Sequence, residues 1–309
     1  MKSDIIASVI YLKNKVHKWR NISALLFFFS IIILIKFIFF NQDHEVDGIT
    51  NYIAEIKIEN TIFENDYRSD VLNKIALQDN VKAVLVRVNS PGGGIVGSEI
   101  LYRDLLAISQ RKPLVVLMES VAASGAYMAS LASNHIIAHN GTLTGSIGVL
   151  MQAPNVSDLA NKIGVTVKTY KSSPAKGYPN LTENFNQDYD KIIQSSIDDS
   201  FNFFKGLVEA RRKNRLQPEY YSEIFDGRVF TGRQALEVGL IDEIGFRSDA
   251  IKYLIKKDPQ LKGLSIREIS IVKKEGKLVD GFLGIIPFLN SIITNKVIDK
   301  NQAIMTILK

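Results

Sequence analysis

The sequence predicts an α/β domain, a parallel sheet covered by helices, that follows one N-terminal transmembrane helix. Two observations predict it: an apolar run at residues 22–40 and, from about residue 50, short β-branched runs that alternate with longer amphipathic stretches. Such alternation is typical of parallel strands joined by crossover helices. The chain has 309 residues, of which 46% are hydrophobic and 23% charged, so it has ample material for a buried core.

The apolar run predicts a membrane anchor. As a helix, residues 22–40 would span roughly 28 Å, about the hydrocarbon thickness of a bilayer. Lys36 is its single charge and lies close enough to the far end to snorkel to the interface. The preceding segment is basic, with Lys2, Lys13, Lys15, Lys18 and Arg20. By the positive-inside rule we expect residues 1–21 in the cytoplasm, 22–40 as an uncleaved signal anchor and the rest exported.

The later elements follow in order from the two periodicities. Strands are predicted at residues 52–58, 81–88, 114–119, 135–139 and 165–170. Helices are predicted near residues 66–78, 95–110, 124–133 and 156–163, and apolar residues at helical spacing predict a core-facing helix over 187–212. A small helix-and-turn region is expected over 226–245. We therefore predict one domain over residues 41–256 and an extension over 257–309 that packs on the domain or lies on the membrane surface.

Composition narrows the possible chemistry. The chain has no cysteine, which excludes disulfides, thiolate metal sites and a cysteine nucleophile. Its four histidines are scattered, so we expect no histidine-rich metal site: His17, His44, His135 and His139. The net charge of +6 is spread over the N-terminal segment and separate C-terminal lysines, so we expect no nucleic-acid partner.

A glycine-rich turn, "SPGGGIVG" (90–97), follows the second predicted strand and precedes a helix. Gly92, Gly94 and Gly97 fit a dinucleotide fingerprint, and Glu119 stands at about the expected distance. However, the motif follows the second strand rather than the first, and Pro91 stiffens the turn. A flexible turn is a second interpretation. The third is that bare backbone N–H groups here form half of an oxyanion hole.

Ser124, in "MESVAASGAYMAS" (118–130), lies between small residues where a predicted strand gives way to a helix. A serine at a helix start is often an N-cap. The same place suits a nucleophile, because free N–H groups and the helix dipole favour a developing negative charge. No histidine is an attractive partner: His135 is roughly 16 Å away along a continuous helix, and His44 abuts the membrane segment.

Several ordered motifs resemble those of the signal peptide peptidase A family, in its short, single-domain bacterial form. They cover roughly residues 50–256 and read "NSPGGG" (89–94), "AASGAY" (122–127), "TLTGSIGV" (142–149), "YKSSPAK" (170–176) and "DGRVFTGRQALEVGLID" (226–242). The resemblance implies a fold of the Clp protease and crotonase type and a serine-lysine dyad. It implies Ser124 as the nucleophile, Lys176 as the general base, Ser146 as the residue that holds the lysine, and the N–H groups of Gly93 and Gly125 as the oxyanion hole.

The lysine assignment has an alternative. Short-form members commonly read K-S-G-x-x-K-D, whereas this chain has Ser173 in place of the glycine and Gly177 in place of the aspartate. Long-form enzymes keep the base in the Y-K-S part, which corresponds to Lys171. Short-form spacing favours Lys176. For either lysine, a solvated surface charge is the ordinary alternative.

The resemblance implies a serine endopeptidase that degrades cleaved signal peptides, or other apolar peptides, at the periplasmic face of the bacterial inner membrane. It implies no metal or nucleotide cofactor, and a homo-oligomer in which the serine of one protomer meets the lysine of its neighbour. A related membrane protease with other substrates, or a non-catalytic scaffold of the same fold, are the alternatives. We expect the whole chain to be a single-pass membrane protein with a cytoplasmic N-terminus.

Overall fold

A computed structural model of the chain describes residues 2–40 and 50–273. The chain divides into two units, Met1–Thr50 and Asn51–Lys309. The first contains α1 (Lys2–Phe40), whose stretch Tyr11–Leu34 is long and apolar enough to cross a membrane. The expected anchor at residues 22–40 lies within this helix. The apolar "GFLGIIPFLNSII" of the predicted C-terminal extension lies outside the described residues.

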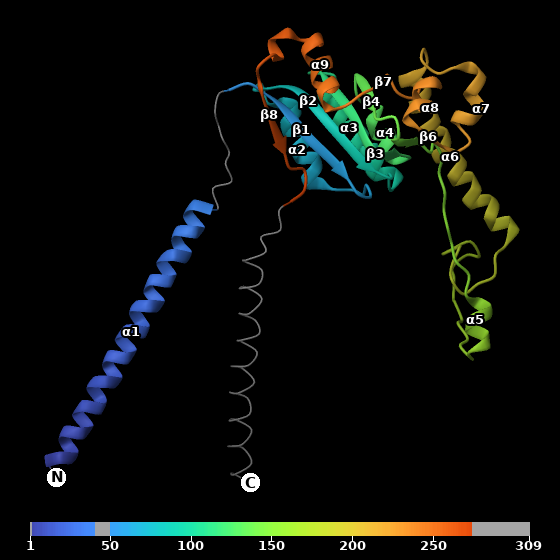
Figure 1. Cartoon of the computed structure of the whole chain (residues 1–309). Coiled ribbons are helices and arrows are strands. Elements are labelled where there is room, and N and C mark those ends of the chain that lie inside the picture. The colour runs from blue at the N-terminus through green and yellow to red at the C-terminus, as the bar shows by residue number, and fades with distance from the viewer. Residues whose placement is uncertain (1, 41–49, 274–309) are drawn as a thin grey trace. The chain divides into compact units, whose positions relative to one another are not determined.

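The second unit is built on a mixed sheet whose pairs are all parallel except one (Figure 1). Its main path runs β6-β5-β3-β2-β1-β8; β4 also pairs with β3, and β7 pairs with β4. Among the strands of the described residues, only β5 and β6 pair antiparallel. The strands are β1 (Tyr52–Glu59), β2 (Val81–Ser90), β3 (Leu114–Ala123), β4 (His135–Ala138), β5 (Leu143–Gly145), β6 (Val229–Thr231), β7 (Glu243–Ile244) and β8 (Ser265–Ile269).

Helices cover both faces of this sheet, so the predicted α/β fold class is confirmed. The helices of the unit are α2 (Asp66–Leu77), α3 (Ile95–Ser109), α4 (Gly125–Ser130), α5 (Ser157–Lys162), α6 (Gln187–Arg212), α7 (Tyr221–Ile224), α8 (Gly232–Glu237) and α9 (Arg247–Lys257). Two short 3₁₀ turns are η1 (Pro218–Tyr220) and η2 (Pro259–Leu261).

Alternation along the strands produces two cores. In β1, Ala54, Ile56 and Ile58 face the larger core, which α2, α3 and α4 cover, while Ile53 faces the smaller core beneath α9. The buried Glu55 carboxylate lies on the α9 side and pairs with Arg247 and Arg87. These ion pairs hold the pKa of Glu55 below its usual range, Arg247 contributing most.

The predicted strand at residues 165–170 is wrong, because no strand is present there in the described structure. Its side chains are exposed, Val165 by 48%, Val167 by 52% and Tyr170 by 83%. The β-branched run has the strand propensity but pairs with no neighbouring strand, and a strand without a partner satisfies neither its backbone nor its apolar face. Within the predicted extension, by contrast, residues 265–269 join the sheet as β8 beside β1.

Residues 150–186, which we call the arm, extend away from the sheet (Figure 1). Hydrogen bonds such as those from Val156 N–H to Leu181 O (2.7 Å) and Asn155 Nδ2 to Glu183 O (2.9 Å) hold the arm together, and the Tyr178 hydroxyl also bonds to Asp190 on α6. The following helix α6 returns to the domain. Its predicted apolar stripe enters the core only in its C-terminal half, at Phe204 and Val208, while Ile192 is exposed.

Candidate active site

Ser124 occupies a sharp turn between β3 and α4. Its φ of 53° and ψ of −123° place a non-glycine residue in a sparsely populated region, a strain of about 1–3 kcal/mol. Its backbone is held on both sides: its N–H donates to Gly145 O (2.8 Å) and its carbonyl accepts from Met128 N–H (2.9 Å). Its side chain makes no capping hydrogen bond to α4, so the capping interpretation does not describe this serine. Ser124 is partly exposed, so its hydroxyl is available to a substrate.

Ser146 lies beside this turn. Ala123 and Gly145 are paired in the parallel β3–β5 ladder. Ser124 and Ser146, the residues that follow them, therefore lie side by side at the same end of the two strands. Ser146 also has a positive φ, 49°, and its N–H donates to Arg228 O (2.9 Å). The sheet thus brings together two of the serines that the motifs single out.

The glycine turn is pressed against residue 62. Ile62 N–H donates to Gly92 O (2.8 Å) and Gly94 N–H donates to Ile62 O (3.0 Å), which makes Gly93 the bridged residue. In a parallel ladder, the residue that lies between the two hydrogen-bonded residues of its own strand points its N–H to the opposite side. The Gly93 N–H therefore points away from Ile62 and has no acceptor among the described residues.

Gly125 supplies a second free N–H. It is the first residue of α4, and the first N–H groups of a helix have no partner within it. A Cβ at Gly125 would lie 3.3 Å from Gly93 N, so the two glycine backbones are close neighbours. Gly92 fits equally tightly, since a Cβ there would lie 2.7 Å from Gly125 N and 3.1 Å from Ser124 Cβ. Gly92 is therefore required by backbone packing around Ser124, whereas the nearest neighbour of a Cβ at Gly125 would be a side chain, that of Ser98.

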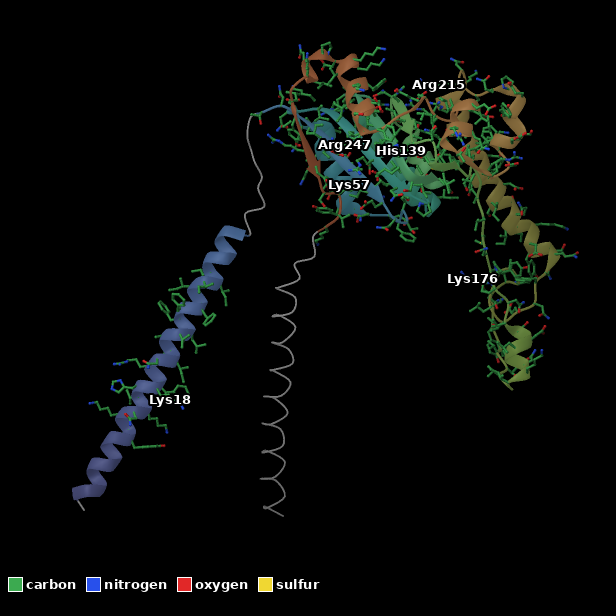
Figure 2. The ribbon with its side chains drawn as sticks, viewed as in Figure 1. Lys18, Lys57, His139, Lys176, Arg215 and Arg247 are labelled. Atoms are coloured by element: carbon green, nitrogen blue, oxygen red, sulfur yellow. The ribbon has the colours of Figure 1, made fainter. Side chains whose placement is uncertain are left out.

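The two candidate lysines lie elsewhere, on the arm. Lys176 is exposed, and among the described residues its side chain makes no hydrogen bond or ion pair. Figure 2 shows it on the arm, away from the sheet that carries Ser124. Lys171 pairs with Glu183, and this hydrogen bond holds the pKa of the Glu183 carboxyl below its usual range. A single chain therefore brings Ser124, Ser146 and the two glycines together but leaves Lys176 apart.

The histidines with described surroundings in this unit have other partners. His135 pairs with Glu243 (3.0 Å) and stacks on Tyr253 with ring centroids 4.0 Å apart. It is paired with Val115 at the start of β3, about 30 Å along the strand from Ser124. His139 bonds to Gly245 O (2.9 Å). No group of three or more His, Asp or Glu side chains suited to a metal ion is found among the residues the structure describes.

The sequence motifs do not predict one further side chain at this site. Ser98, in the first turns of α3, is fully buried, and its Oγ has no hydrogen-bond partner in the described structure. A Cβ at Gly125 would lie 2.0 Å from this Oγ, so Ser98 fills the space behind Gly125. The only sequence signal was a small residue in the turn after the glycines. Its closeness to Gly125 arises from α3–α4 packing, which the sequence does not display.

A serine on a strand-to-helix turn beside two free backbone N–H groups is an arrangement found in serine peptidases. Comparison with known proteins agrees with this class. The model of Peptidase family S49 matches residues 107–261, and the chain belongs to this family.

Named relatives support the same family. The chain is 38% identical over 200 residues to a candidate protease of Synechocystis, an alignment that covers 64% of this chain and 71% of the relative. It is 37% identical to a candidate signal peptide peptidase of Enterococcus faecium, over 64% of this chain and 57% of the relative. It is 35% identical to Protease 4 of Salmonella typhi, over 60% of this chain but only 30% of that longer protein.

Proposed function

We propose that this protein is a membrane-anchored endopeptidase that cleaves apolar peptides, signal peptides among them, with a Ser124–Lys176 dyad. Ser146 orients the lysine amine, and the N–H groups of Gly93 and Gly125 bind the oxyanion. The observation that carries the proposal is the strained turn at Ser124, whose free hydroxyl lies beside Ser146 and the two N–H groups.

The proposed reaction is acyl transfer. Ser124 Oγ attacks the peptide carbonyl carbon while the lysine amine takes the hydroxyl proton. The carbonyl oxygen becomes an oxyanion held by the two glycine N–H groups. The lysine returns the proton to the leaving amine, which breaks the C–N bond. Water then hydrolyses the acyl-enzyme by the same route, with the lysine again as base. No metal or nucleotide takes part.

A lysine base must be neutral when it acts. Its ordinary pKa of about 10.4 has to fall by roughly three units, equivalent to about 4 kcal/mol, which burial among apolar groups and neutral hydroxyls can supply. Lys171 is a poor candidate, because its amine is already paired with the Glu183 carboxylate on the same arm. Lys176 carries no such partner among the described residues, which supports it as the base.

We further propose that the lysine of one copy serves the serine of another. The arm that carries Lys176 exposes many apolar side chains: Leu150, Met151, Leu159, Ile163, Val165, Val167 and Leu181. An exposed apolar surface of this extent is typical of an interaction site rather than of a monomer surface. Packing of the arm against a neighbouring copy would bury these side chains and bring the amine to a Ser124–Ser146 pair.

The location is proposed from α1 and the charges before it. The helix anchors the chain in the bacterial inner membrane with its N-terminus in the cytoplasm and the catalytic unit in the periplasm. Signal peptides left in the membrane are apolar segments within reach of a domain tethered there. The relative named as a candidate signal peptide peptidase supports this substrate class.

The test uses the full chain purified in detergent, with a fluorophosphonate probe and a fluorogenic apolar peptide. We expect labelling and cleavage by the native chain, and neither by Ser124→Ala. Mixing Ser124→Ala with Lys176→Ala chains should restore part of the activity, because some interfaces then pair an intact serine with an intact lysine. Differently tagged chains that co-purify but remain inactive would refute the shared site. Preference for a soluble polar protein over signal peptides would instead indicate a membrane protease with other substrates.

A further inference from the structure

The short loop between β1 and α2 is locked against the glycine turn. Besides the two hydrogen bonds of Ile62, the packing is so close that a Cβ at Gly93 would lie 2.0 Å from Ile62 O. The next residue of the loop, Phe63, is packed just as closely, because a Cβ at Gly97 would lie 2.6 Å from its carbonyl carbon. The backbone of residues 62–63 therefore sets the position of the turn that carries the Gly93 N–H.

Arg68 holds this loop in place through two hydrogen bonds. Arg68 is buried, and its Nη2 donates to Phe63 O (2.9 Å) and Gly97 O (3.4 Å). The guanidinium thus joins one carbonyl of the loop to one carbonyl of α3. The start of α2 is also capped, because the Asn65 side chain accepts from Arg68 N–H (2.9 Å). The opposite charges that face the guanidinium are Asp104 on α3 and Glu64 in the loop.

We infer that Arg68 is a positioning residue of the oxyanion hole, acting through Phe63 and Ile62 on the peptide that joins Gly92 to Gly93. This peptide carries both groups that matter: its carbonyl accepts from Ile62 N–H, and its N–H is the proposed oxyanion donor. The inference rests on the proposed function. Arg68 touches neither the nucleophile nor the substrate in this scheme.

Loss of the guanidinium has two expected effects. The carbonyls of Phe63 and Gly97 lose a buried donor, which destabilises the loop. The Gly93 N–H then loses its alignment, and that alignment is needed in the transition state rather than in the bound substrate. Loss of one oxyanion donor lowers kcat by about 10²–10³ in other serine peptidases, so misalignment should lower kcat by about tenfold to hundredfold with KM changed by less than about twofold.

The chain contains a matched control at the opposite end of α2. Lys112 is a partly buried cation that, like Arg68, donates to two carbonyls: Ile75 O and Gln78 O, each at 2.8 Å. Both cations tie α2 to the region of α3, but Lys112 does so at the end of α2 remote from the glycine turn. Removing Lys112 therefore tests the cost of losing such a tie without disturbing the loop at residues 62–63.

The experiment compares native chain, Arg68→Met, Arg68→Lys and Lys112→Met in detergent. It measures kcat, KM, thermal midpoint, and the affinities of a peptide aldehyde, which forms a tetrahedral adduct, and of the matching uncleaved peptide amide. We expect Arg68→Met to lose kcat and aldehyde affinity in parallel while amide affinity stays unchanged. Arg68→Lys, which keeps a donor, should recover part of both. Lys112→Met should lower the thermal midpoint and leave kcat within about twofold of the native value.

Three outcomes overturn the inference while leaving the proposed function in place. Native kcat in Arg68→Met below its melting temperature would show that the clamp does not position the donor. An equal loss of kcat in Lys112→Met would make the effect one of general stability. If Arg68→Met does not fold, native kcat and aldehyde affinity in the folded Arg68→Lys variant, at a lowered thermal midpoint, would assign the arginine to stability alone. A native chain without peptidase activity would refute the proposed function itself, and the inference with it.

Discussion

Substitution of Gly125 by alanine tests the packing behind the proposed oxyanion hole. The added Cβ would lie 2.0 Å from Ser98 Oγ and 2.9 Å from Ser98 Cβ. Gly125 does not have a positive φ, so alanine is compatible with its backbone conformation and the conflict comes chiefly from Ser98. The hydroxyl can rotate away, but Ser98 Cβ cannot move without shifting α3. The expected result is a displaced Gly125 N–H.

The size of the defect follows from this geometry. Overpacking of a well-packed core costs about 1–3 kcal/mol of stability. A displaced oxyanion donor costs about 2.7–4 kcal/mol in transition-state binding, so kcat should fall by about 10²–10³. The double substitution Gly125→Ala/Ser98→Gly removes both conflicting atoms of Ser98 and should restore kcat to within about tenfold of native. Ser98→Gly alone breaks no side-chain hydrogen bond of the described structure and should cost about 1 kcal/mol, as glycine does in a helix.

Gly93→Ala provides the contrasting case. Its Cβ would lie 2.0 Å from Ile62 O and 2.6 Å from Ile62 N, which are backbone atoms. No single side-chain truncation can relieve that conflict, so its loss of activity should persist in the Ser98→Gly background. The assay is a double-mutant cycle in kcat/KM together with urea unfolding of each variant. Equal inactivity of Gly125→Ala with and without Ser98→Gly, or native activity of Gly125→Ala alone, would refute this account of the site.

Three further predictions concern the base, the ion pairs and the membrane orientation. Activity should rise with pH as the lysine base loses its proton, and Lys176→Ala should be much more damaging than Lys171→Ala; the reverse order would assign the base to Lys171, and two mild effects would reject the dyad. Because Glu55 has a pKa below its usual value of 4.5, its ion pairs stabilise the fold fully above that pH and are lost as the pH falls through the lowered value. In Glu55→Gln, the free energy of unfolding, measured by urea denaturation, should therefore fall less steeply as the pH drops below 4.5, and an unchanged slope would contradict this role. Protease added to spheroplasts should digest the catalytic unit, whereas digestion only after lysis would reverse the proposed topology.

The strands β1 to β4 could be predicted because they carry their own signal. Buried parallel strands such as Val81–Ser90 are nearly continuous apolar runs, and amphipathic helices separate them. The three-residue strand β5 is too short to produce a pattern of its own. The run at residues 165–170 has the pattern without a partner strand. Strand formation depends on a neighbour, which local sequence does not specify.

The candidate site divides in the same way. Ser124 and the glycine turn could be found because each lies at a strand-to-helix transition with a distinctive composition. Ser98 and Arg68 could not, because their roles depend on backbones that meet only in the folded domain. Arg68 reads in the sequence as an ordinary charge on an amphipathic helix, and only its burial and its two carbonyl partners distinguish it.

The proposed division of the active site follows from how its two halves are held. The strain at Ser124 persists because the sheet and α4 fix its backbone on both sides. The arm extends away from the sheet, and its Lys176 amine is exposed to water rather than placed beside Ser124 (Figure 2). In the proposed scheme, the packing that buries the apolar side chains of the arm also removes water from the lysine. Assembly and activation of the base are then one event, so an unassembled chain holds a formed nucleophile and oxyanion hole but cannot start the reaction.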